Sequence, residues 1–257
     1  MSEEVRPKSG VEEIVGESPA LRQALASLKR LAQSDAAVLI VGERGSGKEL
    51  FARVIHRTSA RRHNSFVKVQ VATTARELLE SDLFGDQKGA PTDAPTGKIG
   101  TLELADKGTL FLHDVAQLPL HLQAKLISVL NRGEIKRSDT RAIPVNARLI
   151  AATRHDFKEL VSKNRLHQDF YDQLKASFIQ LPPLRERRED IPLLTQYFVR
   201  KFARRVNRKI EAVPSETMDA LLDHSWPGNV EQLENFIERS VILTTAGSEL
   251  QAPLDEL

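Results

Sequence analysis

The junction between a short apolar run and a glycine-rich loop constrains this sequence more than any other feature. Residues 37–41 are apolar and rich in β-branched side chains, and a loop of the pattern G-x-x-x-x-G-K follows at once and opens a helical pattern. In such a loop the backbone N–H groups surround a phosphate, the lysine neutralises charge on the β- and γ-phosphates, and the dipole of the next helix adds to the attraction. The sequence therefore predicts a phosphate-binding loop made of Gly42, Glu43, Arg44, Gly45, Ser46, Gly47, Lys48 and Glu49. The alternative is a glycine-rich turn that binds no ligand.

Apolar runs of similar length recur along the chain and alternate with helical patterns. The runs cover residues 37–41, 65–71, 109–115, 147–153 and 177–181, and helical patterns such as 49–59 and 118–133 lie between them. This alternation predicts parallel strands joined by crossover helices, in an α/β domain whose sheet is covered on both faces. The strand before the phosphate-binding loop is central in this architecture, so we expect Leu39 and Ile40 inside a five-stranded sheet and not at its edge.

The pattern changes after residues 181–190, which read LPPLRERRED. From Ile191 onward only helical patterns are visible, and Pro214-Ser215 is a start signal for one helix. We therefore expect an N-terminal tail over 1–11, an α/β domain over 12–187, a small helical domain over 188–245 and a C-terminal tail over 246–257.

The composition excludes several kinds of protein. Lys and Arg total 37 against 35 Asp and Glu, so the net charge of +2 gives no overall argument for nucleic-acid binding. The chain has no cysteine, which excludes disulfides, thiolate metal sites and cysteine nucleophiles. No apolar run approaches the ~20 residues that span a bilayer, and no targeting segment is visible. We expect a soluble protein of the cytoplasm without a membrane partner.

Beside the loop at 42–49, further stretches resemble those of one bacterial family. They are LFARVIH (50–56), ELLESDLFG (77–85), GTLELADKGTLFLHDV (100–115), ARLIAAT (147–153), LPPLRERREDIPLL (181–194) and WPGNVEQLEN (226–235). Together they resemble the AAA+ domain of sigma-54-dependent bacterial transcription activators, and the likeness extends over about residues 12–245.

This resemblance implies a P-loop α/β domain with a small C-terminal helical lid domain, in a ring-forming ATPase that binds ATP or ADP and remodels RNA polymerase carrying sigma-54. Members of the family usually carry a sensory domain before this one and a DNA-binding helix-turn-helix domain after it, and we expect neither within this chain. A loop that ends in Gly-Lys-Glu is usual in the family, so Glu49 agrees with nucleotide binding. Ile14, Val15 and Gly16 match the family's stretch around the adenine.

The end of the third strand departs from the family, which has Asp-Glu where this chain has His113-Asp114. In the family one acid holds Mg²⁺ and its water, and the other acts as base on the attacking water. A neutral imidazole is a poor ligand for magnesium and a protonated one repels it. Asp114 is left as the candidate Mg²⁺ ligand and, with His113, as a candidate catalytic group. The alternative for His113 is a strand-end histidine with no chemistry.

The remaining positions that act on the γ-phosphate in the family also differ. Arg154 replaces the asparagine that orients the attacking water, and arginine cannot accept a hydrogen bond from water. Arg154 is therefore either a phosphate-binding residue or a solvated loop residue. His167 and Gln173 stand where an ungapped alignment places the two arginine fingers, and Glu231 replaces the later sensor arginine. One finger is worth about 10³ to 10⁵ in rate, so we expect hydrolysis to be impaired.

The loop that engages sigma-54 in the family is altered as well. The family signature Gly-Ala-Phe-Thr-Gly-Ala is here Gly89-Ala-Pro-Thr-Asp-Ala94. Pro91 replaces the aromatic residue that touches sigma-54, and Asp93 replaces a glycine that can adopt positive φ. We expect this loop not to engage sigma-54, and a solvated hairpin over 88–98 with no partner is the alternative that its composition favours.

The leading hypothesis is a degenerate AAA+ domain of a transcription regulator, which binds nucleotide for structure or signalling and self-associates weakly. Contact with DNA would then require another domain. Two alternatives stay open. One is an active ATPase in which Asp114 holds magnesium and His113 assists, and the other is an assembly or adaptor module that binds no ATP.

Overall fold

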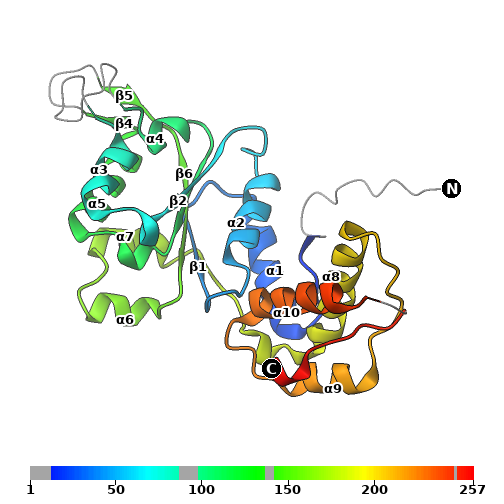
Figure 1. Cartoon of the computed structure of the whole chain (residues 1–257). Coiled ribbons are helices and arrows are strands. Elements are labelled where there is room, and N and C mark those ends of the chain that lie inside the picture. Colours follow the sequence, from blue (N-terminus) through cyan, green and yellow to red (C-terminus); the bar gives the residue numbers. More distant parts are fainter. Residues whose placement is uncertain (1–12, 87–97, 137–141, 246–247) are drawn as a thin grey trace. The chain divides into compact units, whose positions relative to one another are not determined.

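The computed structural model describes residues 13–86, 98–136, 142–245 and 248–257 (Figure 1). The expected tail at 1–11 and the loop signature at 89–94 therefore lie outside the described residues. The chain forms two compact units. Of the described residues, the lid unit contains 13–26, 42–47, 181–245 and 248–257, and the sheet unit contains 27–41, 48–86, 98–136 and 142–180. The domain boundary expected at 187 stays a prediction.

Within the described ranges, the sheet unit is built on a five-stranded parallel sheet, as the sequence predicts. Its strands are β1 (Val38–Val41), β2 (Phe66–Gln70), β3 (Thr109–His113), β6 (Arg148–Thr153) and β7 (Phe178–Gln180). The order is β2-β3-β6-β1-β7, and every neighbouring pair is parallel. β1 lies between β6 and β7, so the prediction that Leu39 and Ile40 occupy an internal strand is confirmed. A short antiparallel pair, β4 (Glu134–Ile135) and β5 (Ile143–Pro144), is separate from this sheet.

Helices cover both faces of the sheet. α2 (Lys48–Arg57) lies on one face, and α3 (Arg76–Phe84), α5 (Leu120–Arg132) and α7 (Gln168–Leu174) lie on the other (Figure 1). β1 and β6 are buried at every residue, which is typical of parallel strands covered on both sides. The other helices are α1 (Pro19–Ala32), α4 (Thr101–Leu104) and α6 (Phe157–Ser162). Among the described helices, none has the length and apolar character that a membrane span needs.

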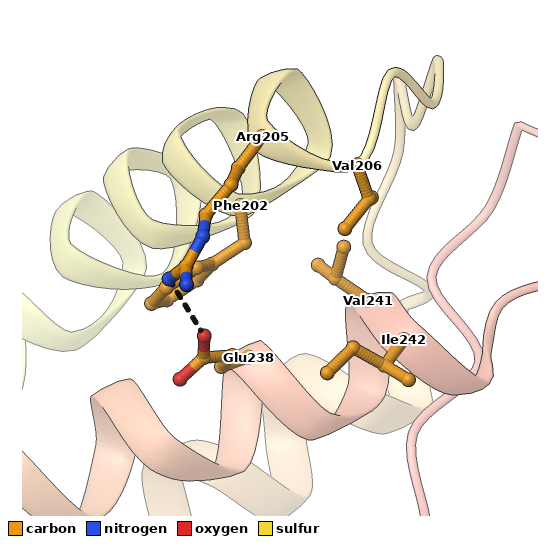
Figure 2. Close-up of a pocket in the computed structure, with 6 residues that line it drawn as sticks. All are labelled: Phe202, Arg205, Val206, Glu238, Val241 and Ile242. Atoms are coloured by element: carbon orange, nitrogen blue, oxygen red, sulfur yellow. Dashed lines mark hydrogen bonds and ion pairs between the residues drawn. The ribbon is translucent and has the colours of Figure 1, made fainter.

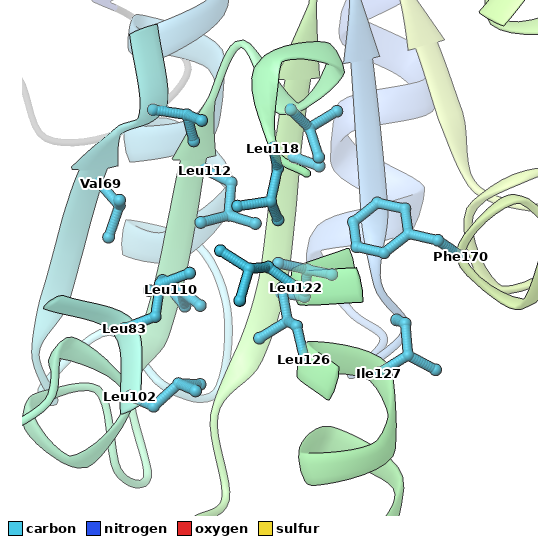
Figure 3. Close-up of a cluster of buried hydrophobic side chains, with 14 of the residues drawn as sticks. Val69, Leu83, Leu102, Leu110, Leu112, Leu118, Leu122, Leu126, Ile127 and Phe170 are labelled. Atoms are coloured by element: carbon cyan, nitrogen blue, oxygen red, sulfur yellow. The ribbon is translucent and has the colours of Figure 1, made fainter. Parts of the chain in front are cut away.

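The main core lies between the sheet and the helices of the α5 face (Figure 3). Alternate residues of the strands point into it, because successive side chains of a strand lie on opposite faces. Strands contribute Val69, Leu110 and Leu112, and the helices contribute Leu83, Leu102, Leu122, Leu126, Ile127 and Phe170. This core fixes the carboxyl ends of the strands, where the candidate site residues lie.

The lid unit is mainly helical, with α8 (Ile191–Arg205), α9 (Ser215–Asp223) and α10 (Asn229–Leu243) around a core of its own. Trp226 is fully buried in this core and its indole Nε1 donates to the carbonyl oxygen of Leu221 at 2.8 Å. α9 begins at Ser215, directly after Pro214, as the start signal predicts.

The last described residues also join the lid core. Ala212 forms a parallel bridge with Glu249, so the expectation of helical structure alone after residue 191 is wrong at this point. Leu250 is buried in the lid core, and Leu254 and Leu257 pack against it. Part of the segment that the sequence analysis treats as a tail therefore contributes to this unit.

Candidate functional site

Residues 42–47 connect β1 to α2 as an irregular turn. Gly45 and Gly47 have φ values of +72° and +100°, a backbone conformation that residues with a side chain rarely adopt. A Cβ atom on Gly47 would meet nothing within 4 Å. The backbone at Gly47 is therefore open to a ligand.

Two polar side chains of the loop are buried. Ser46 is 3% exposed, and its hydroxyl has no hydrogen-bond partner in the described part of the chain. Lys48, the first residue of α2, is 7% exposed. Buried polar groups are nearly always satisfied, so the orphaned Ser46 hydroxyl fits a polar ligand such as a phosphate group.

Three successive carbonyl groups of the loop accept hydrogen bonds from other segments of the lid unit. The carbonyl of Arg44 accepts from the Asn229 amide at 2.8 Å, that of Gly45 from the Glu231 N–H at 3.2 Å, and that of Ser46 from the Arg187 guanidinium at 3.3 Å. The C=O and N–H groups of a trans peptide point in opposite directions. The N–H groups of Gly45 and Gly47 therefore point away from these contacts, which is the arrangement that a phosphate cradle needs.

The side chain of Asn229 forms hydrogen bonds directly with the loop. It is fully buried and has a φ of +53°, and its Oδ1 accepts from the Leu184 N–H at 2.7 Å. Its amide nitrogen donates to the Arg44 carbonyl and, at 3.1 Å, to the Glu43 carboxylate. A single side chain thus joins two segments of the lid unit that lie far apart in sequence.

Two arginines of the segment 184–190 also form hydrogen bonds with residues of the loop. Arg185 donates to both carboxylate oxygens of Glu43 at 2.6 and 2.8 Å, and this hydrogen bonding raises the pKa of Arg185. Arg187 is 4% exposed, and burial lowers its pKa. The sequence analysis missed the contacts of Asn229, Arg185 and Arg187. In the sequence, these three residues are marked only by their place in LPPLRERRED and WPGNV, two of the stretches that carry the family resemblance.

The segment expected around the adenine is anchored through the residues that follow it. Asp190 is fully buried, and its carboxylate accepts from the N–H of Glu17 at 2.6 Å, the N–H of Ser18 at 2.9 Å and the Ser18 hydroxyl at 2.7 Å. Gly16 has a φ of +140°, and a Cβ there would lie 2.7 Å from the Asp190 carboxyl group. Val15 packs against the lid core. The adenine-binding role of Ile14, Val15 and Gly16 stays a prediction.

β3 ends at His113, two residues earlier than the apolar run predicts. The reason is Asp114, which adopts a left-handed conformation with φ +62° and starts a short 3-10 turn. His113 Nδ1 and Asp114 Oδ1 are both buried without a hydrogen-bond partner among the described residues. Burial, followed by the charges of Lys48 and Lys68, lowers the pKa of His113, so its imidazole is neutral near pH 7.

Glu49 is fully engaged by two cations of the sheet unit. Lys68 Nζ lies 2.6 Å from Glu49 Oε2, and the Arg53 guanidinium donates to Oε1 at 2.8 and 3.1 Å. Burial acts to raise the pKa of Glu49, but hydrogen bonds from Lys68 and Arg53 outweigh it and the pKa is lowered. The sequence analysis did not single out Lys68, because a lysine in a strand carries no motif.

The sheet unit offers few side-chain ligands for magnesium at the positions that the sequence analysis singles out. Mg²⁺ prefers an octahedral set of oxygen ligands. Both oxygens of Glu49 are taken, His113 offers nitrogen, and Asp114 supplies the one remaining carboxylate at these positions. The described residues contain no group of three His, Asp, Glu or Cys side chains that could hold a metal ion. Among the described residues, no second side chain therefore accompanies Asp114 as a ligand for Mg²⁺, and its role as a Mg²⁺ ligand stays a prediction.

The structure shows what surrounds the residues at the expected positions of the water sensor and the arginine fingers. Arg154 follows β6 directly and is exposed. His167 is the N-cap of α7, where its Nδ1 accepts from the Asp169 N–H at 3.3 Å. Gln173 donates to the Asn131 side chain. His167 and Gln173 thus serve contacts within their own unit.

A pocket of about 130 Å³ lies in the lid unit between the C-terminal ends of α8 and α10 (Figure 2). It is lined by Phe202, Arg205, Val206, Glu238, Val241 and Ile242, and the Arg205–Glu238 ion pair of 3.2 Å spans it. No candidate nucleotide-binding residue lines this pocket. It is also smaller than the roughly 300–1,000 Å³ of typical small-molecule sites.

The Asn229 contacts lead to a stability prediction. Asn229→Gly keeps the positive φ accessible but removes the amide, which leaves the buried Leu184 N–H and Arg44 carbonyl without partners. We expect the free energy of unfolding to fall by about 2 kcal/mol or more. The measurement is urea unfolding followed by the fluorescence of Trp226, the single tryptophan.

Asn235→Gly is the matched control, since Asn235 is exposed on the same helix and should cost under about 0.5 kcal/mol. Equal effects of the two substitutions would show that the Asn229 amide does not hold the loop.

Comparisons with known proteins cover nearly the whole chain. The model of the sigma-54 interaction domain matches residues 14–180, and that of the AAA+ ATPase lid domain matches residues 185–253. The formate hydrogenlyase transcriptional activator FhlA of Escherichia coli (strain K12) is 48% identical over 246 residues, which are 95% of this chain and 35% of that protein. The transcriptional regulatory protein ZraR of Klebsiella oxytoca is 43% identical over 244 residues, 94% of this chain and 55% of that protein. The chain thus spans only 35% and 55% of the length of these two relatives.

Solved structures are also similar to this chain over most of its length. The crystal structure of NtrX from Brucella abortus in complex with ATP has a TM-score of 0.86 and 35% identity, and covers 95% of this chain and 54% of that chain. The complex of the same protein with ADP has a TM-score of 0.83 and 34% identity, and covers 95% of this chain and 55% of that chain. The family match spans more than half of this sequence, and the chain therefore belongs to the sigma-54 interaction domain family of AAA+ transcription activators.

Proposed function

We propose that this chain is the nucleotide-binding module of a transcription regulator, and that it binds ATP or ADP but is impaired in hydrolysis and in sigma-54 engagement. The observation that carries the first part is the loop at 42–47, with its three carbonyls held by the lid unit and Gly47 open to a ligand. The NtrX structures in complex with ATP and with ADP support the same ligands here. Residues 42–49 would bind the phosphates, and Ile14–Gly16 would lie at the adenine.

Impaired hydrolysis is proposed from side chains of the sheet unit that stand at the family's catalytic positions. The strand-end pair is His113-Asp114, and the finger positions hold His167 and Gln173, which are engaged within their own unit. Catalytic groups that act as a unit are strongly non-additive, so the loss of several cannot be offset by one survivor.

One observation favours the rival hypothesis of an active ATPase. His113 Nδ1 and Asp114 Oδ1 are both buried and lack partners in the described residues, and such groups often mark functional positions. A pair of this kind could act on a water molecule even though it differs from the family's two acids. The hydrolysis test below therefore uses Asp114 as its reporter.

Lys48 gives the test of nucleotide binding. Lys48→Ala removes a buried ammonium beside the loop, and we expect the affinity for ATP to fall by about tenfold or more, because charge-assisted hydrogen bonds contribute about 1.5–3 kcal/mol. Isothermal titration calorimetry measures this directly. Lys125→Ala is the control, since Lys125 pairs with Glu80 on the surface. Equal affinity of Lys48→Ala and Lys125→Ala would refute the role of Lys48, and absence of ATP binding by the unchanged chain would favour the adaptor hypothesis, in which no ATP is bound.

Assembly is the second test. Arginine fingers couple ATP to subunit contacts in the family, and neither finger position here carries a cation that is permanently charged. We expect a monomer or weak dimer whose sedimentation is the same with ATP and with ADP. A hexamer that forms only with ATP would contradict the proposal.

Hydrolysis is the third test. We expect phosphate release near background at protein concentrations high enough to force assembly. The double change His113→Asp with Asp114→Glu should leave it there, whereas adding His167→Arg and Gln173→Arg should raise it, because fingers are worth about 10³ to 10⁵ in rate. Robust turnover by the unchanged chain that Asp114→Ala abolishes would instead establish the rival hypothesis.

A further inference from the structure

Arg187 is a buried cation of the lid unit without a paired acid. It is 4% exposed, and its Nη2 donates to the Ser46 carbonyl at 3.3 Å. Its Nε atom is buried without a hydrogen-bond partner, and the described part of the chain contains no ion pair of Arg187. A buried charge without a partner costs free energy, so an anion that binds close to this guanidinium would stabilise the lid unit.

Asp190 is the acid whose charge acts on Arg187, and it does not remove this cost. It acts to raise the pKa of Arg187, but burial outweighs it and the pKa is lowered. Its carboxylate already accepts hydrogen bonds at both oxygens, from the N–H groups of Glu17 and Ser18 at Oδ1 and from the Ser18 hydroxyl at Oδ2. The positive charge of Arg187 is therefore only partly compensated.

The other charged side chains beside the loop in the lid unit are paired or exposed. Glu43 pairs with Arg185 at 2.6 Å. Arg44 and Glu231 are exposed, so water and salt screen their charges. Among the described residues of the lid unit that form hydrogen bonds with the loop, Arg187 is thus the buried charge, which acts on the loop with little screening.

The peptide group between Ser46 and Gly47 points away from Arg187. Its carbonyl accepts from Arg187, and the N–H of Gly47 points the opposite way because the peptide is trans. The Ser46 hydroxyl lies against Gly42, where a Cβ would be 2.7 Å from it, and it has no hydrogen-bond partner in the described ranges. The Gly47 N–H and the Ser46 hydroxyl can therefore donate to an anion, with the charge of Arg187 behind the N–H.

We propose that Arg187 is the buried counter-ion of the phosphate groups that the loop binds, and that it acts on them through the peptide group of Ser46 and Gly47. The proposal rests on the nucleotide binding proposed above and assigns a role to a residue outside the loop at 42–49. Arg187 is a positioning residue, since it does not touch the nucleotide. A phosphate at the Gly47 N–H would lie roughly 8 Å from the guanidinium, where the attraction of two unit charges inside a protein changes affinity by about tenfold or more.

The test is calorimetric titration of ATP into the unchanged chain and two variants. Arg187→Met removes the charge and the hydrogen bond, whereas Arg187→Gln removes the charge but keeps an N–H donor for the Ser46 carbonyl. We expect both variants to bind ATP about tenfold or more weakly than the unchanged chain, because the charge and not the hydrogen bond produces the effect.

Stability without nucleotide separates this role from a structural one. Removal of a buried charge that lacks a partner is often neutral or stabilising. The urea midpoint of Arg187→Gln, followed by the fluorescence of Trp226, should therefore equal or exceed that of the unchanged chain. A residue that only shaped the loop would lower the urea midpoint together with the affinity.

Arg188→Met is the control, since Arg188 is the next residue of the same segment and is exposed. It should bind ATP within about threefold of the unchanged chain, because solvent screens its charge. Equal affinity of Arg187→Met and Arg188→Met would overturn the proposal, and so would ATP binding by Arg187→Gln that matches the unchanged chain. Unfolding of both Arg187 variants would also overturn it, because Arg187 would then be required for the fold. Absence of ATP binding by the unchanged chain would instead refute the proposed nucleotide binding itself, and this proposal with it.

Discussion

The hydrogen bonds that three successive carbonyls of the loop accept are the constraint on which the candidate site depends. A loop between a strand and a helix lacks the repeating backbone hydrogen bonds of regular secondary structure, and its buried backbone groups must find other partners. Here Asn229, Glu231 and Arg187 supply them from other parts of the lid unit. Turning the carbonyls one way turns the adjoining N–H groups the other way, so the same contacts that satisfy the loop also shape it for an anion.

The close approach at Gly45 shows how tightly this arrangement is specified. A Cβ there would lie 2.0 Å from the Gly228 carbonyl oxygen, so a residue with a side chain would displace backbone. Gly228 immediately precedes Asn229, and the Asn229 N–H bonds to the Trp226 carbonyl at 2.8 Å. The fully buried indole of Trp226 thus fixes the turn that presents the Asn229 amide. Packing of the lid core and the shape of the loop are linked through these few residues.

Hydropathy and motif spacing were sufficient to predict the sheet and the loop, because both are local. Apolar runs with β-branched residues marked all five strands to within two residues, and the glycine spacing marked the turn after β1. The end of β3 was misplaced because the left-handed conformation of Asp114 leaves no trace in an apolar pattern. The contacts of Arg185 and Asn229 with Glu43 join residues 142 and 186 positions apart, and no local pattern reveals such pairs. Lys68 was missed for the same reason, since its contact with Glu49 joins a residue of β2 to a residue of α2 that lies 19 positions away.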